Sequence, residues 1–152
     1  MAEFTAKDVQ ALRQSTGVGM MDAKKALDAN GGDVEKATLW LREQGLASAA
    51  KRSDRDASEG AVSVVRDGSV AAIVQLQSET DFVAKAAEFT SVVDEIAARV
   101  AAKGVEAVAE FDEEIDTMRT TLKENISVGK VIRLEAGAGE VIDTYLHAQA
   151  GR

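Results

Sequence analysis

The residues of this chain that are best suited to chemistry are a dense run of carboxylates and a single histidine. Asp112, Glu113, Glu114 and Asp116 could attract a divalent cation, but they lack the loop pattern and the glycine of an EF-hand. A solvated helix N-terminus, favoured by the helix dipole, explains the run without a metal. His147 has no second histidine and no cysteine to join it, so we expect no zinc site and no catalytic role for it.

Two glycine-containing segments could suggest nucleotide binding, and neither fits a known pattern. Gly17-Val18-Gly19 is not part of a phosphate loop, and residues 137–139 lack the third glycine of a dinucleotide fingerprint. We therefore predict no cofactor and no direct contact with a nucleotide. A small hydrolase that uses the acidic run stays open as an alternative, although the sequence shows no nucleophile and base for it. This alternative predicts that turnover is lost when Asp112 or Glu114 is changed.

Composition and charge exclude further classes. Of the 152 residues, 18 are Lys or Arg and 26 are Asp or Glu, which gives a net charge of −8. Such acidity disfavours sequence-independent binding to nucleic acid. No apolar run is long enough to span a membrane, and residues 1–4 lack the basic stretch and apolar core of a secretory signal. We expect a cytoplasmic protein that is not an enzyme.

The charge is distributed unevenly along the chain. Residues 1–55 contain 8 acidic and 9 basic residues, whereas residues 56–152 contain 18 acidic and 9 basic residues. A shift of this kind indicates a boundary, and the polar, alanine-rich stretch beside it has no sustained apolar period. We therefore predict a helical module over residues 1–46, a connector over 47–58 and an α+β core domain over 59–152.

The spacing of apolar residues predicts three short helices in the first module. Thr5 and Asp33 are good N-caps, glycine-containing turns at 15–19 and 30–32 separate the helices, and Gly45 is expected to end the third. The apolar positions at helical spacing are Val9 and Leu12, then Met20, Ala23 and Leu27, then Val34, Ala37 and Leu41.

The second part alternates between strand and helix patterns. Strands are predicted at 60–65 and 69–77 around the hairpin signal Asp67-Gly68. One helix is predicted to end near Lys103, and a second is predicted over residues 112–124. No secondary structure is predicted for residues 105–109. A second hairpin is predicted from strands at 128–135 and 140–147. The fold class is therefore α+β, with a three-helix bundle followed by an antiparallel sheet that carries helices on one face.

Three blocks of sequence resemble the elongation factor Ts family. They are LRQSTGVGMMDAKKAL at 12–27, WLREQG at 40–45 and ETDFVAK at 79–85. Each is similar to a family signature, and their order and spacing agree with the family over the length of this chain. The resemblance implies a translation factor that acts as guanine-nucleotide exchange factor for elongation factor Tu. It also implies that the three helices resemble a ubiquitin-associated domain and dock on the GTP-binding domain of that partner.

The resemblance implies a set of partner-binding residues. In the family, the Phe of the TDF segment wedges between partner helices and disturbs the Mg²⁺ and phosphate end of the nucleotide site. Burial in the chain's own core is the alternative for this Phe, and Asp81 could instead cap the following helix. The residues matched to partner contacts are Thr80, Asp81, Phe82, Val83, Arg13, Met20, Met21, Lys24, Leu122 and His147. Solvated-helix, core or surface roles stay open for the last six.

The chain also departs from the family pattern. Ala23 replaces a frequent Cys, Lys123 occupies a place where Gly is common, and Gly129-Lys130 replaces a frequent Arg pair. Family members continue after Tyr-x-His into a second core subdomain, so we expect this chain to lack the C-terminal half and to show weaker binding and incomplete exchange. The main alternative function is a binding adaptor that uses the three-helix module alone, and it leaves the TDF block without a role.

Overall fold

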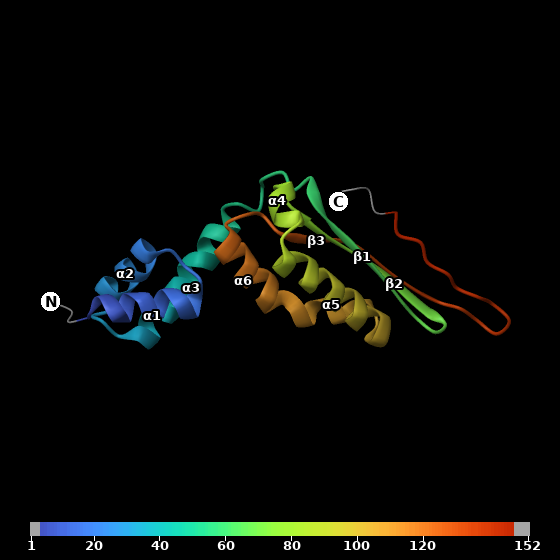
Figure 1. Cartoon of the computed structure of the whole chain (residues 1–152), viewed down its shortest axis with the longest axis horizontal. Helices are drawn as coiled ribbons and strands as arrows, with labels where there is room; N and C mark the ends of the chain where they lie inside the picture. The colour runs from blue at the N-terminus through green and yellow to red at the C-terminus, as the bar shows by residue number, and fades with distance from the viewer. Residues whose placement is uncertain (1–3, 148–152) are drawn as a thin grey trace. The chain divides into compact units, whose positions relative to one another are not determined.

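The computed structural model describes residues 4–147 and divides the chain into two compact units, with the boundary between Lys51 and Arg52. The first unit contains three helices and the second contains a sheet with helices (Figure 1). The predicted α+β class is confirmed.

The three-helix unit consists of α1 (Ala6–Thr16), α2 (Met20–Ala29) and α3 (Val34–Ala50). The Thr5 hydroxyl accepts a hydrogen bond from the Asp8 amide, and the Asp8 carboxylate accepts one from the Thr5 amide at 2.7 Å. This reciprocal capping box begins α1. The Asp33 carboxylate likewise accepts from the Lys36 amide and begins α3.

The prediction that Gly45 ends the third helix is wrong. Helix α3 continues to Ala50, so residues 47–50 of the expected connector are helical. An interior glycine costs a helix only about 1 kcal/mol relative to alanine, and good helix formers follow it here. A glycine ends a helix when it takes the left-handed conformation, as Gly17 does after α1 with φ 71°.

Alanines and leucines dominate the core of the three-helix unit. Its buried residues are Val9, Leu12, Ala23, Ala26, Leu27, Ala37 and Leu41. The prediction that Met20 belongs to the apolar face of α2 is wrong. Met20 is the first residue of that helix and is 47% exposed, and burial begins one turn later at Ala23.

The second unit is built on a three-stranded antiparallel sheet. Strands β1 (Glu59–Asp67), β2 (Val70–Ser78) and β3 (Ser127–Glu135) lie in the order β1-β2-β3. The first hairpin is confirmed, but Asp67 pairs with Val70 as the last residue of β1. The two loop residues are therefore Gly68, with φ 56°, and Ser69.

Helices cover one face of this sheet, as Figure 1 shows for α5 (Ala87–Lys103) and α6 (Asp112–Leu122). The stretch left unassigned after Gly104 is a 3-10 segment, η1 (Val105–Phe111). The buried core of the unit comprises Ala72, Val74, Leu76, Phe89, Val93, Ile96, Ala97, Val100, Ala101, Phe111, Ile115, Met118 and Ile126. The other sheet face carries exposed apolar side chains from all three strands, Val62, Ile73, Ile132 and Leu134.

The predicted strand at 140–147 does not form. After β3 the Gly137 amide donates to the Glu140 carboxylate, and the chain returns to an ion pair of 3.1 Å between Arg66 and Asp143 without joining the sheet. The alternating residues Val141 and Tyr145 are 91% and 82% exposed. A strand pattern is stabilised by burial of one face, and this segment buries neither side well.

A bulge interrupts the pairing of β2 with β3. The register shifts between Val74 and Leu76, so that Gly129 and Lys130 lie opposite Gln75 alone. The Gln75 side-chain oxygen accepts a hydrogen bond of 3.2 Å from the Lys130 amide. A β-carbon at Gly129 would lie 2.4 Å from that oxygen, so the absence of a side chain there makes room for it.

Candidate functional site

The TDF segment follows β2 and forms a short helical turn, α4 (Asp81–Ala84). Ala84 is buried and Val83 packs against the core, whereas Phe82 is 84% exposed. The core alternative for Phe82 is therefore excluded in the free chain. An aromatic ring held out in water beside two anchored residues is a typical recognition element.

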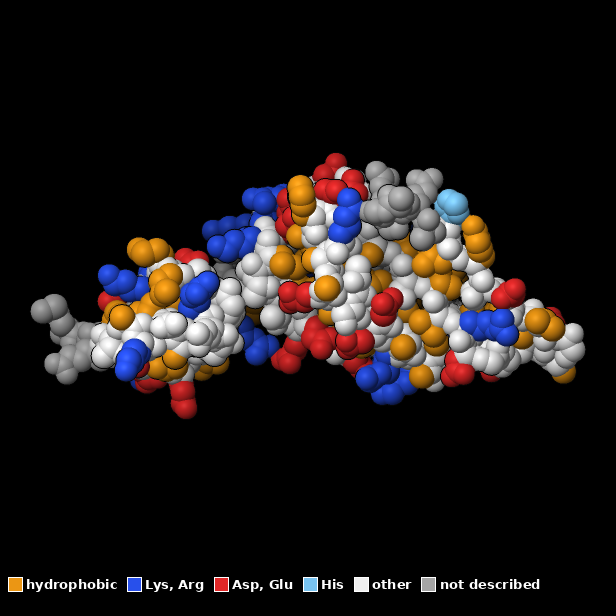
Figure 2. All heavy atoms as spheres, in the orientation of Figure 1, with side chains coloured by type: hydrophobic (Ala, Val, Ile, Leu, Met, Phe, Trp, Pro, Cys, Tyr) orange, Lys and Arg blue, Asp and Glu red, His pale blue; other side chains and the backbone are white. Residues whose placement is uncertain are grey.

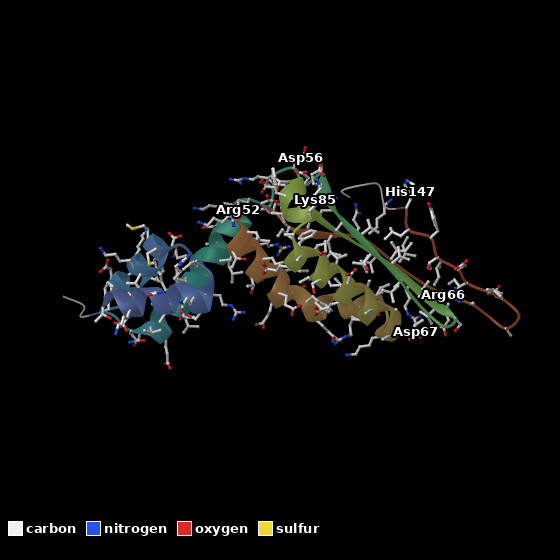
Figure 3. The ribbon with its side chains drawn as sticks, viewed as in Figure 1. Arg52, Asp56, Arg66, Asp67, Lys85 and His147 are labelled. Carbon is white, nitrogen blue, oxygen red and sulfur yellow. The ribbon has the colours of Figure 1, made fainter. Side chains whose placement is uncertain are left out.

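Thr80, not Asp81, caps α4. The Thr80 hydroxyl accepts a hydrogen bond of 3.4 Å from the Val83 amide. Asp81 instead binds Lys85, one turn later, with an N–O distance of 2.7 Å. The Lys85 ammonium donates a hydrogen bond to the carboxylate and lowers the pKa of Asp81 below its ordinary value. Asp81 therefore remains charged at neutral pH beside the exposed ring, and Figure 3 labels Lys85 at this turn.

The backbone ahead of Phe82 is bound by a carboxylate that the sequence analysis did not single out. The Glu124 carboxylate accepts from the amides of Glu79 and Thr80 at 3.0 and 3.1 Å, and from the Thr80 hydroxyl. In return, the Glu79 carboxylate accepts from the Asn125 amide at 2.7 Å. These partners are 44 to 46 residues apart, so no local spacing in the sequence could have indicated them.

Leu122 and His147 occupy different surroundings in the same unit. Leu122 is half-buried against the core at the end of α6, two residues before Glu124. His147 lies at the end of the extended segment, where its Nδ1 is 2.9 Å from the Tyr145 hydroxyl. It is exposed and lies away from α4 in Figure 3. The structure thus brings Leu122, but not His147, to the TDF side of the unit.

The remaining predicted residues belong to the three-helix unit. Arg13 lies in the last turn of α1, and Met20, Met21 and Lys24 lie in the first half of α2. All four are exposed, and Met21 is 74% exposed. Figure 2 shows hydrophobic and basic side chains side by side on this unit. A flexible thioether pair beside cations suits a protein-binding surface.

The acidic run forms the N-terminal turn of a helix. Asp112, Glu113 and Glu114 are the first three residues of α6, where carboxylates favour the positive end of the helix dipole. Within residues 4–147, no three His, Cys, Asp or Glu side chains gather closely enough to hold a metal ion. Nor does any helix in that range combine the length and hydropathy needed to cross a bilayer.

Comparison with known proteins gives a consistent result. A family model described as elongation factor TS matches residues 79–152. Elongation factor Ts of Ruegeria sp. (strain TM1040) is 48% identical over 97% of this chain and 52% of its own length. The protein of that name from Kineococcus radiotolerans is 44% identical over 99% of this chain and 57% of its own length, and that from Treponema denticola is 38% identical over 96% and 52%.

The chain thus spans about half the length of the curated relatives it matches. The similarity covers both units, including the blocks around Met20 and Phe82. Over the length it spans, the chain is similar to proteins named elongation factor Ts.

Proposed function

We propose that this chain binds elongation factor Tu and promotes release of its GDP. The observation that carries the proposal is the projecting Phe82, 84% exposed on a turn whose other residues are capped, ion-paired or buried. The family resemblance assigns this ring to a wedge between partner helices, next to the Mg²⁺ and phosphate end of the nucleotide site. The similarity to elongation factor Ts over nearly the whole of this chain supports the partner.

Exchange activity of this kind needs no acid, base or nucleophile in the chain. It needs a complex in which binding of the chain and binding of GDP oppose each other, and by linkage each weakens the other by the same factor. A projecting aromatic ring can supply this coupling, because it gains contact area only when the partner opens to accept it. Buried aromatic anchors frequently dominate the binding energy of an interface.

The second proposed contact is the surface formed by Arg13, Met20, Met21 and Lys24. Its apolar and basic members are exposed and therefore accessible to a protein. We assign this surface to affinity and Phe82 to release. Substitutions of the two methionines should therefore raise the concentration needed for half-maximal exchange, with a smaller effect on the maximal rate.

The deciding experiment measures release of a fluorescent GDP from elongation factor Tu as the concentration of this chain is raised. Phe82→Ala should reduce the maximal acceleration by at least roughly tenfold, as expected for loss of an interface hot spot. Leu134→Ala is the matched control, because it also truncates an exposed apolar side chain of the same unit, 58% exposed on the outer sheet face. It should leave the acceleration unchanged.

The possible results separate the alternatives. Binding without acceleration would mean that this chain docks on the GTPase but cannot act as exchange factor. If the chain shows no binding and no acceleration, the proposal is contradicted and the adaptor function of the three-helix unit is favoured. An equal loss in both variants would show that Phe82 has no special part in release.

A further inference from the structure

We propose that Glu124 is a positioning residue for Phe82. It fixes the backbone of the TDF segment so that the ring is already held outward before the partner arrives. This inference rests on the proposed function, since it concerns how the exchange element is held. Neither the sequence motifs nor the family resemblance assigned a role to Glu124.

The geometry around Glu124 is that of a clamp on the backbone. One carboxylate oxygen accepts from two successive amides, those of Glu79 and Thr80, and the other accepts from the Thr80 hydroxyl. Hydrogen bonds to a charged acceptor are roughly twice as strong as neutral ones. Thr80 is also the cap of α4, so the clamp extends through its hydroxyl to the Val83 amide. Phe82 lies between these two held residues.

A second carboxylate reinforces the clamp in the opposite direction. The Glu79 carboxylate accepts from the Asn125 amide at 2.7 Å and lies 3.7 Å from the Arg55 guanidinium. The Asn125 side-chain amide donates to the carbonyls of Ser53 and Arg55 at 3.1 and 2.7 Å. The segments at 53–55, 79–80 and 124–125 are therefore joined side by side, although they are distant in sequence.

The preceding residue explains how Glu124 reaches the TDF segment. Lys123 has φ 58° and is the one non-glycine residue with positive φ in the described part of the chain. Its left-handed conformation ends α6 and turns the backbone, after which Glu124 and Asn125 face Glu79. An L-residue held in this conformation costs on the order of 1 kcal/mol. The hydrogen bonds of Glu124 and Asn125 hold the backbone at Lys123 in this conformation. A strained conformation that is held by its surroundings is typical of a functional constraint.

The clamp would act through preorganisation. Glu79 and Thr80 are the last residues before the helical turn, and without Glu124 their amides have no acceptor in the described structure. The free chain would then sample other arrangements of the turn, and the partner would bind only the fraction with the ring correctly placed. The loss of exchange activity in Glu124→Ala would therefore depend on Phe82, and it would disappear when the ring is absent.

A double-mutant cycle on GDP release tests this dependence. Glu124→Ala should reduce the acceleration at subsaturating chain roughly five- to thirtyfold in the Phe82 background, and less than about twofold in the Phe82→Ala background. Glu124→Gln keeps a side-chain oxygen that can accept from the two amides, so it should recover part of the loss. Glu114→Ala removes an exposed carboxylate from the first turn of α6 and is the control, with no expected effect.

Equal losses from Glu124→Ala in both backgrounds would overturn the proposal, because Glu124 would then act independently of Phe82. If Glu124→Ala does not fold, the same cycle with Glu124→Gln decides. A second readout does not depend on exchange. The backbone order parameter of Phe82, measured by NMR on the free chain, should be about 0.85 and should fall below about 0.6 in Glu124→Ala.

This readout separates the two proposals. If the unsubstituted chain neither binds elongation factor Tu nor accelerates release, the proposed function fails. The order parameter of Phe82 still tests whether Glu124 positions this backbone. An unchanged order parameter in Glu124→Ala would overturn the positioning role even if exchange activity is present.

Discussion

Three of the seven buried core residues of the three-helix unit are alanines, whereas the core of the second unit contains Phe89, Phe111, Ile96 and Met118. The first unit has a small core of seven buried residues, none of them aromatic. The second surrounds one sheet face with large side chains and adds the hydrogen bonds of the Glu124 clamp. Under the proposed function, the smaller unit provides an accessible binding surface, and the larger unit holds Phe82 in place.

The sharpest test of this comparison is a matched pair of core substitutions. Leu27→Ala should cost roughly 2–5 kcal/mol and Phe89→Ala roughly 3–5 kcal/mol, since both side chains are fully buried. The free energy of unfolding is typically about 0.05–0.15 kcal/mol per residue, and the second unit is about twice as long as the first. Leu27→Ala is therefore expected to unfold the first unit, whereas the second unit is expected to stay folded in Phe89→Ala. Hydrogen exchange followed by mass spectrometry reports each unit separately. Joint loss of protection in both units would break the comparison.

A smaller effect is expected from exchanging the residues that end two helices. Helix α1 ends on Gly17 with φ 71° and helix α6 on Lys123 with φ 58°. Gly17→Lys should destabilise the three-helix unit by about 1 kcal/mol, and Lys123→Gly should stabilise the second unit by about 0.5–1 kcal/mol. Thermal unfolding of the two variants measures both. Changes in stability of the same sign in both variants would contradict the inference that the backbone of Lys123 is strained.

The smallest effect concerns how each unit holds its carboxylates. The pKa of Asp8 and the pKa of Asp33 are lowered chiefly by hydrogen bonds from backbone amides, whereas the pKa of Asp81 and that of Glu110 are lowered chiefly by side-chain hydrogen bonds from Lys85 and Lys103. Raising the salt concentration to about 1 M screens exposed charges. It should therefore raise the pKa of Asp81 and Glu110 toward the ordinary range and move the other two less. NMR titration of the side-chain carboxyl carbons measures this.

The sign of the pH dependence follows from the same shifts. A lowered pKa in the folded state means that each carboxylate stabilises its unit above its ordinary pKa. That contribution is lost as the pH falls below about 4 toward the lower, folded value. Because Asp8 and Asp33 cap α1 and α3, helix content in the first unit should decrease in this range. Constant helix content between pH 5 and pH 3 would contradict the capping role.

Local patterns predicted most of the fold. The capping residues Thr5 and Asp33, the Asp67-Gly68 hairpin and the apolar spacing of α5 and α6 lie within a few residues of the structures they specify. Two predictions were wrong for different reasons. Gly45 does not end α3, because a glycine inside a helix costs little unless it takes the left-handed conformation. Residues 140–147 have strand spacing but do not join the sheet, and spacing alone does not show whether a segment pairs with a distant strand.

The candidate site divides in the same way. The resemblance of the ETDFVAK block to the elongation factor Ts family suggested Phe82, and the structure adds that the ring is exposed in the free chain. Glu124 and Asn125 could not be found from spacing, because their partners lie 44 to 46 residues earlier. The exposure of both Met20 and Met21 was also beyond the helical pattern, since the pattern does not show where the neighbouring helices stop covering α2.

The bulge between β2 and β3 has a consequence for how this sequence can change during evolution. Gly129 accommodates the Gln75 side chain, whose oxygen takes the hydrogen bond of the Lys130 amide, and a β-carbon there would lie 2.4 Å from that oxygen. A side chain at 129 is compatible with this sheet only once Gln75 has been replaced or has moved. The residue tolerated at 129 therefore depends on the residue at 75 and on the conformation of its side chain.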